Sequence, residues 1–228
     1  MTKSSPSPIT PARHVVVLGH PALTSFNHEV VARYCKTVRE NGQEAVVRDL
    51  YAIGFDPCLR ADRRPGHATD MSADVAHELG LLRQADVIVF VYPIWFGMPP
   101  AIIKGYVDRV LGVALTPADI RDHRPDSILV GKSFATFSSS ATTRAWLEEQ
   151  GQMESIRQAF DRYLMAIFGM VDAGHVHFGA IVDGLAPRFT DEFLCEVEQH
   201  ARKICSDVAA KRHSMTTKKV MVLQGVAL

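Results

Sequence analysis

The feature that most restricts the fold of this chain is the regular alternation of short apolar runs with longer amphipathic segments. Residues 14–19 (HVVVLG) and 87–91 (VIVFV) are continuous apolar runs, which is typical of strands that are buried on both faces. Between such runs, residues 27–41 carry apolar side chains at helical spacing, with Val30 and Tyr34 on one face. Strands that alternate with helices in this way predict a parallel sheet with helices on both sides.

The boundary signals agree with this alternation. Ser25 or Asn27 can cap the first helix, Gly42 can end it, and Pro99-Pro100 precede a later helix. We expect strands at residues 14–19, 44–50, 87–91, 127–137 and 171–178, and helices at residues 27–41, 72–83, 101–110, 154–168 and 191–210. Five strands favour the order 2-1-3-4-5 over a six-stranded dinucleotide fold. The expected class is therefore an α/β, flavodoxin-like, doubly wound five-stranded parallel sheet.

The composition is that of an ordinary globular protein, with 47% apolar and 22% charged residues. A formal net charge of +0 argues against nucleic acid as a partner. The four cysteines show no metal-type or C-x-x-C spacing, and they fit a reducing cytoplasm better than a disulfide framework. No signal peptide and no run of about 18 apolar residues is found. We expect a flexible leader at residues 1–12, one domain at 13–210 and a basic tail at 211–228.

Three loops with ligand-binding character follow predicted strands. Residues 92–100 (YPIWFGMPP) combine prolines, which fix the backbone and remove donors, with two large aromatic faces. Residues 19–27 (GHPALTSFN) lead into a helix start, where backbone N–H groups and hydroxyls suit a phosphate. Residues 136–141 (TFSSSA) have small side chains that let a ring edge approach the backbone. Because the carboxyl ends of parallel strands share one rim, the loops together predict a ligand site there.

Each loop also has a plainer interpretation. In chain order, the first loop, at residues 19–27, is equally well a capped turn, since the pattern G-x-G-x-x-G of ordinary dinucleotide sites is missing. The aromatic loop is alternatively a hydrophobic closure of the sheet, and the serine run a solvated polar loop. The convergence of all three on one rim favours a ligand, and the flat isoalloxazine ring of a flavin suits the aromatic loop.

At this point the chain resembles the flavodoxin-like NAD(P)H:quinone oxidoreductase family (NAD(P)H dehydrogenases). That family includes ancillary flavoproteins of potassium-efflux systems and reductases of the modulator-of-drug-activity type. The resemblance extends over about residues 14–204 and is carried by residues 19–27, 48–57 (RDLYAIGFDP), 85–110 (ADVIVFVYPIWFGMPPAIIKGYVDRV) and 131–141 (GKSFATFSSSA). It implies a bound flavin, NAD(P)H as co-substrate, a quinone-like acceptor, and a homodimer with active sites at the interface.

The resemblance also implies which residues hold the flavin. The phosphate would sit on the first loop, at His20, Ser25, Phe26 and Asn27. The isoalloxazine ring would lie on the second loop, at Pro93, Ile94, Trp95 and Phe96, and against the third, at Ser138, Ser139 and Ser140. Backbone N–H groups of the last two serines would stabilise charge on the reduced ring. The flavin is FAD or FMN, and the long connection at residues 51–72 favours FAD, because it could cover an adenine.

The third loop departs from the family pattern. In the family, Thr-Thr is followed by paired glycines and then by a tyrosine and a histidine that help to stabilise the reduced flavin. Here residues 140–141 (SA) replace the glycines, and residues 142–146 (TTRAW) contain neither Tyr nor His. No catalytic residue is therefore assigned, and nothing selects Arg144 or Trp146 for that position.

The resulting hypothesis is a cytoplasmic enzyme that passes a hydride from NAD(P)H through its flavin to a quinone-like acceptor by ping-pong exchange. His175 and His177, on the fifth predicted strand, are interpreted as structural. One alternative is a regulatory flavoprotein that contacts a membrane transporter of the potassium-efflux type. Another is a flavodoxin-like electron carrier, which the +0 net charge and the Trp95-Phe96 loop disfavour.

Overall fold

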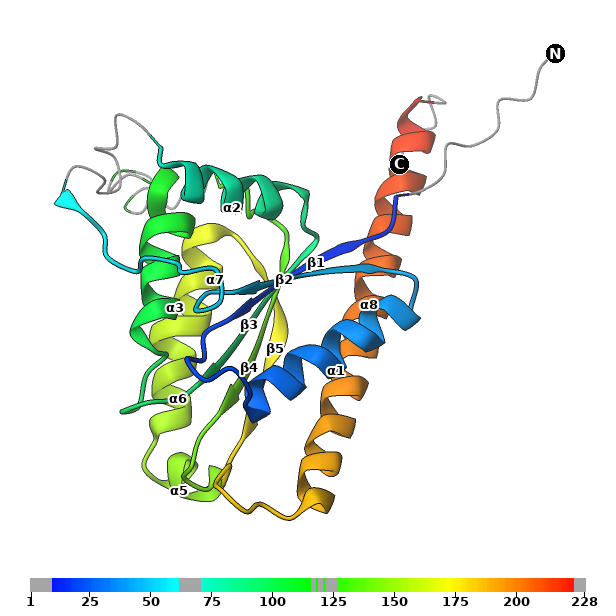
Figure 1. The fold of residues 1–228 in the computed structure, drawn as a ribbon. Helices are drawn as coiled ribbons and strands as arrows, with labels where there is room; N and C mark the ends of the chain where they lie inside the picture. The colour runs from blue at the N-terminus through cyan, green and yellow to red at the C-terminus, as the bar shows by residue number, and fades with distance from the viewer. Residues whose placement is uncertain (1–9, 62–70, 116–117, 119–120, 122–126, 224–228) are drawn as a thin grey trace.

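The computed structural model describes residues 10–61, 71–115, 118, 121 and 127–223, and it contains one sheet of five parallel strands (Figure 1). The strand order is β2-β1-β3-β4-β5, which confirms the flavodoxin-like, doubly wound arrangement. The strands are β1 (Arg13–Leu18), β2 (Glu44–Asp49), β3 (Val87–Pro93), β4 (Ser133–Ser139) and β5 (Val171–Phe178). The helices are α1 (Phe26–Glu40), α2 (Ala73–Gln84), α3 (Ala101–Tyr106), α5 (Arg144–Glu149), α6 (Gln152–Ile156), α7 (Tyr163–Phe168) and α8 (Pro187–Leu223).

Two apolar layers cover the faces of this sheet. α1 and α8 pack side by side on one face, and α2, α3 and α7 lie on the other (Figure 1). β3 occupies the centre of the sheet, and all of its residues are buried, as the unbroken apolar run requires. The helical segments around α3 and α7 continue through π-helical turns, η2 (Val107–Leu111) and η4 (Arg157–Arg162), and a 3-10 turn η3 (Gly112–Ala114) follows η2.

A buried ion pair holds β2 against the α2 and α3 layer. Arg48 donates from Nε to Glu78 at 2.9 Å, and the Glu78 side chain is 3% exposed. The Tyr106 hydroxyl donates to the same carboxylate at 3.1 Å. Glu78 is therefore buried with its charge both paired and hydrogen-bonded, which is the condition under which a buried carboxylate is tolerated.

The described part of the long connection after β2 packs against α3. Phe55 contacts the Tyr106 ring, and Arg109 lies over Phe55 at 5.0 Å. Gly105 permits the approach, because a Cβ there would stand 2.5 Å from the backbone of Pro57. Residues 62–70, on which much of the adenine-covering prediction depends, lie outside the described residues.

Several predicted boundaries were wrong. β4 begins at Ser133, because residues 128–131 form a turn in which Gly131 has φ of 75°. α8 continues to Leu223 and includes the start of the predicted tail, where Lys211 donates to the Gly131 carbonyl and Arg212 contacts Asp86 at 3.3 Å. At the other end, Ala12 is buried and its carbonyl accepts from the Glu44 backbone N–H. None of the helices within the described residues is long and apolar enough to span a membrane.

Candidate functional site

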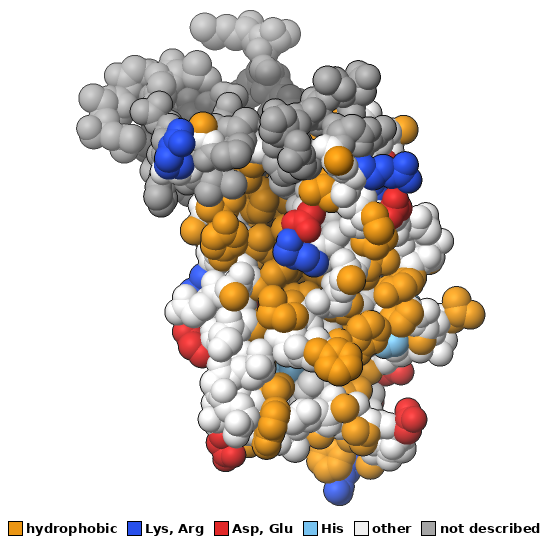
Figure 2. All heavy atoms as spheres, turned by 90° about the vertical axis from the view of Figure 1, so that its left-hand side faces the viewer, with side chains coloured by type: hydrophobic (Ala, Val, Ile, Leu, Met, Phe, Trp, Pro, Cys, Tyr) orange, Lys and Arg blue, Asp and Glu red, His pale blue; other side chains and the backbone are white. Residues whose placement is uncertain are grey.

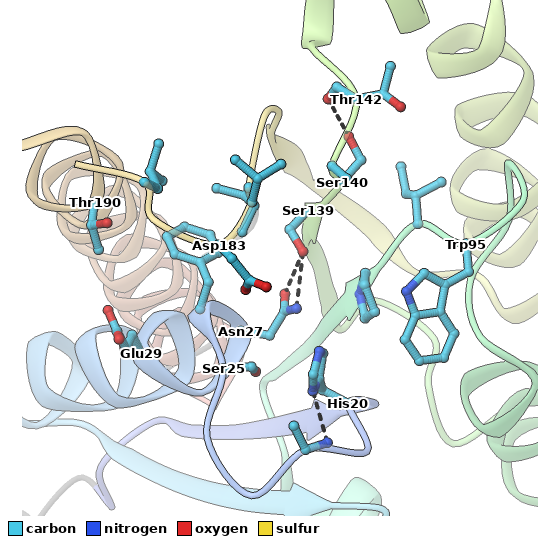
Figure 3. Close-up of a pocket in the computed structure, with 18 of the residues that line it drawn as sticks. His20, Ser25, Asn27, Glu29, Trp95, Ser139, Ser140, Thr142, Asp183 and Thr190 are labelled. Carbon is cyan, nitrogen blue, oxygen red and sulfur yellow. Dashed lines mark hydrogen bonds between the residues drawn. The ribbon is translucent and has the colours of Figure 1, made fainter. Parts of the chain in front are cut away.

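A cavity of about 720 Å³ lies at the carboxyl edge of the sheet, where the segments after β1, β3, β4 and β5 meet (Figure 3). This volume is in the range of about 300–1,000 Å³ that is usual for small-molecule sites. The first three of those segments are the loops that the sequence analysis selected. Ten of the eleven predicted site residues line the cavity, namely His20, Ser25, Phe26, Asn27, Pro93, Ile94, Trp95, Phe96, Ser139 and Ser140.

The first loop ends in the capped start of α1. Ser25 is the N-cap, as one of the two predictions had it, and its hydroxyl accepts from the His28 backbone at 3.4 Å. The same hydroxyl lies 2.8 Å from His28 Nδ1. The backbone N–H groups of Phe26 and Asn27 make no hydrogen bond within the described residues. They belong to the positive end of the α1 dipole, so this edge of the cavity suits an anion.

His20 provides a further donor toward the cavity. Its Nδ1 accepts from the Ala22 backbone at 3.2 Å, so in the neutral ring the proton is on Nε2. Burial, followed by the nearby His28, lowers the pKa of His20, which keeps the ring neutral at physiological pH. Its ring centroid is 6.2 Å from that of Trp95, and the two side chains flank the same space (Figure 3).

Asn27 and Ser139 connect the first and third loops beneath the cavity. The Asn27 amide nitrogen donates to the Ser139 hydroxyl at 3.0 Å, and the hydroxyl is 3.2 Å from the amide oxygen (Figure 3). Both residues are 3% exposed. Asn27 therefore fixes the first turn of α1 against the end of β4, in addition to lining the cavity.

The aromatic loop is a two-residue hairpin turn that stands at the cavity wall. Trp95 and Met98 exchange backbone hydrogen bonds of 3.0 and 3.1 Å, and the two central residues, Phe96 and Gly97, both have positive φ. This is the geometry of a type I′ turn, whose central positions normally hold Asn and Gly. Phe96 is instead a left-handed aromatic residue whose side chain is fully exposed. Strained backbone and an unburied ring are both unfavourable, which is the combination found at functional sites.

The three serines of the third loop do not all face the cavity. Along β4 the side chains alternate, so Ser139 points toward α1 and Ser138 points to the opposite face of the sheet. Ser138 contacts His175 and His177 and does not line the cavity, contrary to the prediction. The error arises because strand alternation decides which serine faces which side, and the sequence did not give the last residue of the strand.

The prediction for the serine backbone N–H groups also needs correction. The Ser140 N–H donates to the Phe178 carbonyl at 3.0 Å, and Ser139 is paired as part of β4 with β3 and β5. The next two N–H groups, of Ala141 and Thr142, line the cavity and make no hydrogen bond within the described residues. The unpaired N–H groups of this loop thus lie one to two residues further along the chain than the serines expected to supply them.

A fourth wall was missed by the sequence analysis. It consists of the segment after β5, at Ile181, Val182, Asp183, Gly184 and Leu185, together with Glu29 of α1 and Thr190 of α8. This segment carries no motif, and only the return of the chain from β5 to α8 brings it to the cavity. Glu29, Asp183 and Thr190 lie on the side of the cavity away from Trp95 (Figure 3).

The residues near the position of the family's tyrosine and histidine point away from the cavity. Arg144 pairs with Glu148 on the surface at 2.8 Å, and Trp146 is 51% exposed on α5. Neither lines the cavity. The described part of the connection at residues 51–72 does not line it either, so the predicted adenine cover finds no support there.

A doubly wound sheet of this strand order, with a cavity at its carboxyl edge, defines an α/β protein of the flavodoxin type. Residues 12–202 match the Flavodoxin_2 family, described as a flavodoxin-like fold, and the chain belongs to this family.

Comparison with individual proteins agrees with this assignment. The chain is 36% identical over 100 residues to an uncharacterized NAD(P)H oxidoreductase of Haemophilus influenzae, a match that covers 43% of this chain and 50% of the relative. It is 33% identical over 134 residues to NAD(P)H dehydrogenase (quinone) 1 of Rattus norvegicus, covering 50% of this chain and 48% of the relative. The chain thus spans about half the length of these curated relatives. The fold is similar to that of an NAD(P)H:quinone oxidoreductase from Methanothermobacter marburgensis, with a TM-score of 0.74 and 23% identity over 86% of this chain and 100% of the other.

Proposed function

We propose that this protein is a flavin-dependent NAD(P)H oxidoreductase that reduces a quinone-like acceptor. The observation that carries the proposal is the strained aromatic turn at Trp95 and Phe96, which stands over a cavity whose floor is the start of α1. A flavin is the ligand that uses both ends, because it joins a flat apolar ring to a phosphate. The relatives named above act as the second line of support.

The residues present fit such a ligand. Unpaired N–H groups at Phe26 and Asn27 and the Nε2 of His20 offer donors to a phosphate. No Lys or Arg is among the described lining residues, so the phosphate would be held by backbone dipoles and hydroxyls. Trp95 and Phe96 would cover one face of the ring, and the N–H groups of Ala141 and Thr142 would meet its edge.

We favour FAD over FMN on the basis of the far side of the cavity. Glu29, Asp183 and Thr190 line that side, beyond the phosphate-type end of α1. Two carboxylates repel a phosphate but accept hydrogen bonds from ribose hydroxyls, as acidic residues do in dinucleotide sites. Glu29→Gln and Asp183→Asn should therefore weaken FAD binding while leaving FMN binding unchanged. Equal losses for both flavins would favour FMN, and mass spectrometry of the released cofactor would identify it directly.

In this mechanism the flavin, when bound, supplies the two-electron chemistry. Trp95 and Phe96 would back one face of the ring and exclude water there, which leaves the opposite face to a nicotinamide or a quinone. A single cavity would serve both substrates in turn. Double-reciprocal plots of initial rate against NAD(P)H concentration, taken at different acceptor concentrations, should therefore give parallel lines, as ping-pong exchange requires. Intersecting lines would show that both substrates are bound together.

We also propose a homodimer. Hydrophobic side chains are spread over the α3 and α7 face (Figure 2), where a groove of about 290 Å³ includes Leu59, Val107, Tyr163 and Ile167. Trp95 and Phe96 are exposed at the cavity mouth, where a second chain would complete the wall. Tyr163→Asp should yield a monomer by light scattering, and a wild-type monomer would refute the proposal. The four free cysteines are compatible with a cytoplasmic location, which we propose as well.

The decisive test compares the two tryptophans of the chain. Stacking of a heteroaromatic ring on an aromatic side chain is worth roughly 1–3 kcal/mol, or about 5- to 150-fold in affinity. Trp95→Ala should weaken flavin binding by that factor and slow quinone turnover, while Trp146→Ala, which removes an exposed tryptophan outside the cavity, should change neither. A wild-type protein that binds neither FAD nor FMN would overturn the proposed function.

A further inference from the structure

A continuous chain of polar side chains leads from the cavity through β4 and β5. Ser140 Oγ is 3.1 Å from His177 Nε2, and His177 Nδ1 is 2.8 Å from Ser138 Oγ. Ser138 Oγ is in turn 2.6 Å from His175 Nε2, and His175 Nδ1 is 2.5 Å from Asp161 Oδ2. Every link is within hydrogen-bonding distance, and all five side chains are almost completely enclosed.

The two ends of this series of hydrogen-bonded side chains lie in different cavities. Ser140 lines the large cavity at the carboxyl edge of the sheet. Asp161 and His175 line a separate cavity of about 250 Å³, which opens between β4, β5 and the η4 turn. A proton that enters at Asp161 and His175 can therefore reach the large cavity without crossing open solvent. A polar cluster that only stabilised the fold would have no need to join two cavities.

We propose that Asp161, His175, Ser138, His177 and Ser140 form a proton relay that supplies the proton consumed when the acceptor is reduced. This inference rests on the function proposed above. NAD(P)H gives up one hydride, whereas conversion of a quinone to a hydroquinone takes up a hydride and one proton. The balance requires one proton per turnover, and the loop residues that the family uses near the flavin are absent here.

The relay has two complete hydrogen-bonding states that differ by one proton. In the loaded state, His175 is an imidazolium paired with Asp161, its Nε2–H donates to Ser138, and Ser138 donates to His177 Nδ1. The His177 Nε2–H then donates to Ser140, whose hydroxyl donates to the Thr142 carbonyl at 2.7 Å. On delivery, Ser140 gives its proton to the acceptor oxygen and takes the Nε2 proton of His177. His177 takes the Ser138 proton at Nδ1, and Ser138 takes the Nε2 proton of His175.

After delivery, His175 is neutral and still donates from Nδ1 to the Asp161 carboxylate, and every hydrogen bond between His175 and Ser140 has reversed its direction. A proton from water in the small cavity restores the imidazolium, and the relay is reset once the Ser138 hydroxyl turns and His177 exchanges its Nδ1 proton for one on Nε2. The tautomer of His177 is therefore coupled to the charge of His175. When His175 is charged, His177 carries its proton on Nε2; when His175 is neutral, His177 carries it on Nδ1. This coupling passes through the Ser138 hydroxyl and has no other route along the chain.

The surroundings keep His177 neutral, as the relay requires. The pKa of His177 is lowered to about 4, first by burial and then by the charges of His175, Arg144 and Arg157, against the opposing effect of Glu148. A neutral imidazole offers one donor and one acceptor nitrogen, which lets it pass a proton without holding one. The charged groups that line the small cavity beside His175 and Asp161 are Arg157, Arg162 and Asp172.

The first test reads the coupling by nitrogen-15 NMR of the histidine side chains in the purified protein, and it does not depend on turnover. In the wild type, the His177 resonances should switch between the two neutral tautomers when His175 gains or loses its proton. Ser138→Ala should abolish the switch, and Ser138→Thr, which keeps the hydroxyl, should restore it. Thr136→Val is the matched control, because Thr136 donates to Asp161 at 3.3 Å from the same face of β4 but lies outside the path.

The second test separates proton delivery from electron transfer. Ser138→Ala should slow reduction of a quinone by on the order of 10²-fold, the lower end of general acid catalysis, and should remove its solvent deuterium isotope effect. Reduction of ferricyanide, which takes up no proton, should keep its wild-type rate. Thr136→Val should resemble the wild type with both acceptors, and Ser138→Thr should recover most of the quinone rate.

The outcomes are distinct from failure of the proposed function. A His177 tautomer that ignores the charge of His175 in the wild type would overturn the relay. Equal losses with quinone and ferricyanide in Ser138→Ala would overturn it too, because they would indicate a general structural defect. Absence of bound flavin would instead refute the proposed oxidoreductase, and the NMR experiment would still decide whether the polar chain conducts a proton.

Discussion

The contact between Asn27 and Ser139 gives a prediction whose size follows from the structure. Asn27→Ala removes the 3.0 Å hydrogen bond and leaves the Ser139 hydroxyl, 3% exposed, without its partner. A net hydrogen bond contributes about 0.5–1.5 kcal/mol, and an unsatisfied buried polar group costs about 1–3 kcal/mol. We therefore expect Asn27→Ala to lower the free energy of unfolding by about 2 kcal/mol, and Ser139→Ala to have a similar effect.

The double variant distinguishes this contact from two unrelated losses. Asn27→Ala combined with Ser139→Ala removes both polar groups, so no unpaired hydroxyl or amide remains from the pair. Its loss of stability should be smaller than the sum of the single losses by about 1–2 kcal/mol. Urea unfolding followed by far-UV circular dichroism measures all four proteins. Strict additivity would refute the direct contact and would reduce each effect to local packing.

Flavin affinity tests whether the same contact prepares the site. If it holds the first turn of α1 against β4, each single variant and the double variant should bind FAD about tenfold more weakly, which corresponds to about 1.4 kcal/mol. The control is Asn41→Ala on the same helix, because Asn41 donates to the Thr37 carbonyl at 2.8 Å at the opposite end of α1. That variant should lose stability and keep its affinity. Equal weakening by Asn41→Ala would show that affinity follows global stability only.

Three further predictions concern single groups. Tyr92→Phe should leave stability unchanged or raise it by up to about 1 kcal/mol, because the buried Tyr92 hydroxyl has no partner within the described residues. Tyr106→Phe should instead lower stability by about 1–2 kcal/mol through loss of the hydrogen bond to Glu78. Urea unfolding measures both variants. The folded pKa of His177, about 4, lies below its unfolded value of 6.5, so the unfolded chain binds more protons between these two pH values. The free energy of unfolding should therefore fall as the pH drops from about 6.5 to about 4. His177→Gln should flatten that part of a pH–stability profile, and an unchanged slope would contradict the assigned burial. Phe96→Gly should stabilise the turn by about 1 kcal/mol by relieving a left-handed residue while it weakens flavin binding, and a loss of stability would refute the strain argument.

The sheet could be predicted because it depends on patterns that are local in sequence. β5 was expected at its observed bounds, Val171–Phe178, and the apolar run of β3 identified a strand that is buried on both faces. α5 (Arg144–Glu149) was not expected, because only Leu147 of its six residues is buried and the segment has no apolar periodicity. Its stability comes from the Thr143 cap and from the surrounding chain, which no local pattern records.

The site was predictable only as far as it consists of loops that follow strands. Three of its walls come from such loops, and their residues could be named from the position of each strand end. The fourth wall, near Asp183, depends on how the chain returns from β5 to α8, and it required the structure. The pairing of Asn27 with Ser139 joins positions that are 112 residues apart, so sequence spacing gave no indication of it.

The serine run shows most clearly what the sequence alone could not separate. Ser138, Ser139 and Ser140 were treated as one polar loop, yet their hydroxyls contact three different sets of partners. The distinction arises because β4 ends at Ser139, so alternation governs Ser138 and Ser139 while Ser140 follows the bend of the chain after the strand. The same alternation on β5 turns His175 and His177 toward Ser138. An acid that other members of the family carry on a loop beside the flavin would here reach the cavity from within the sheet, and the register between β4 and β5 would determine whether it can act.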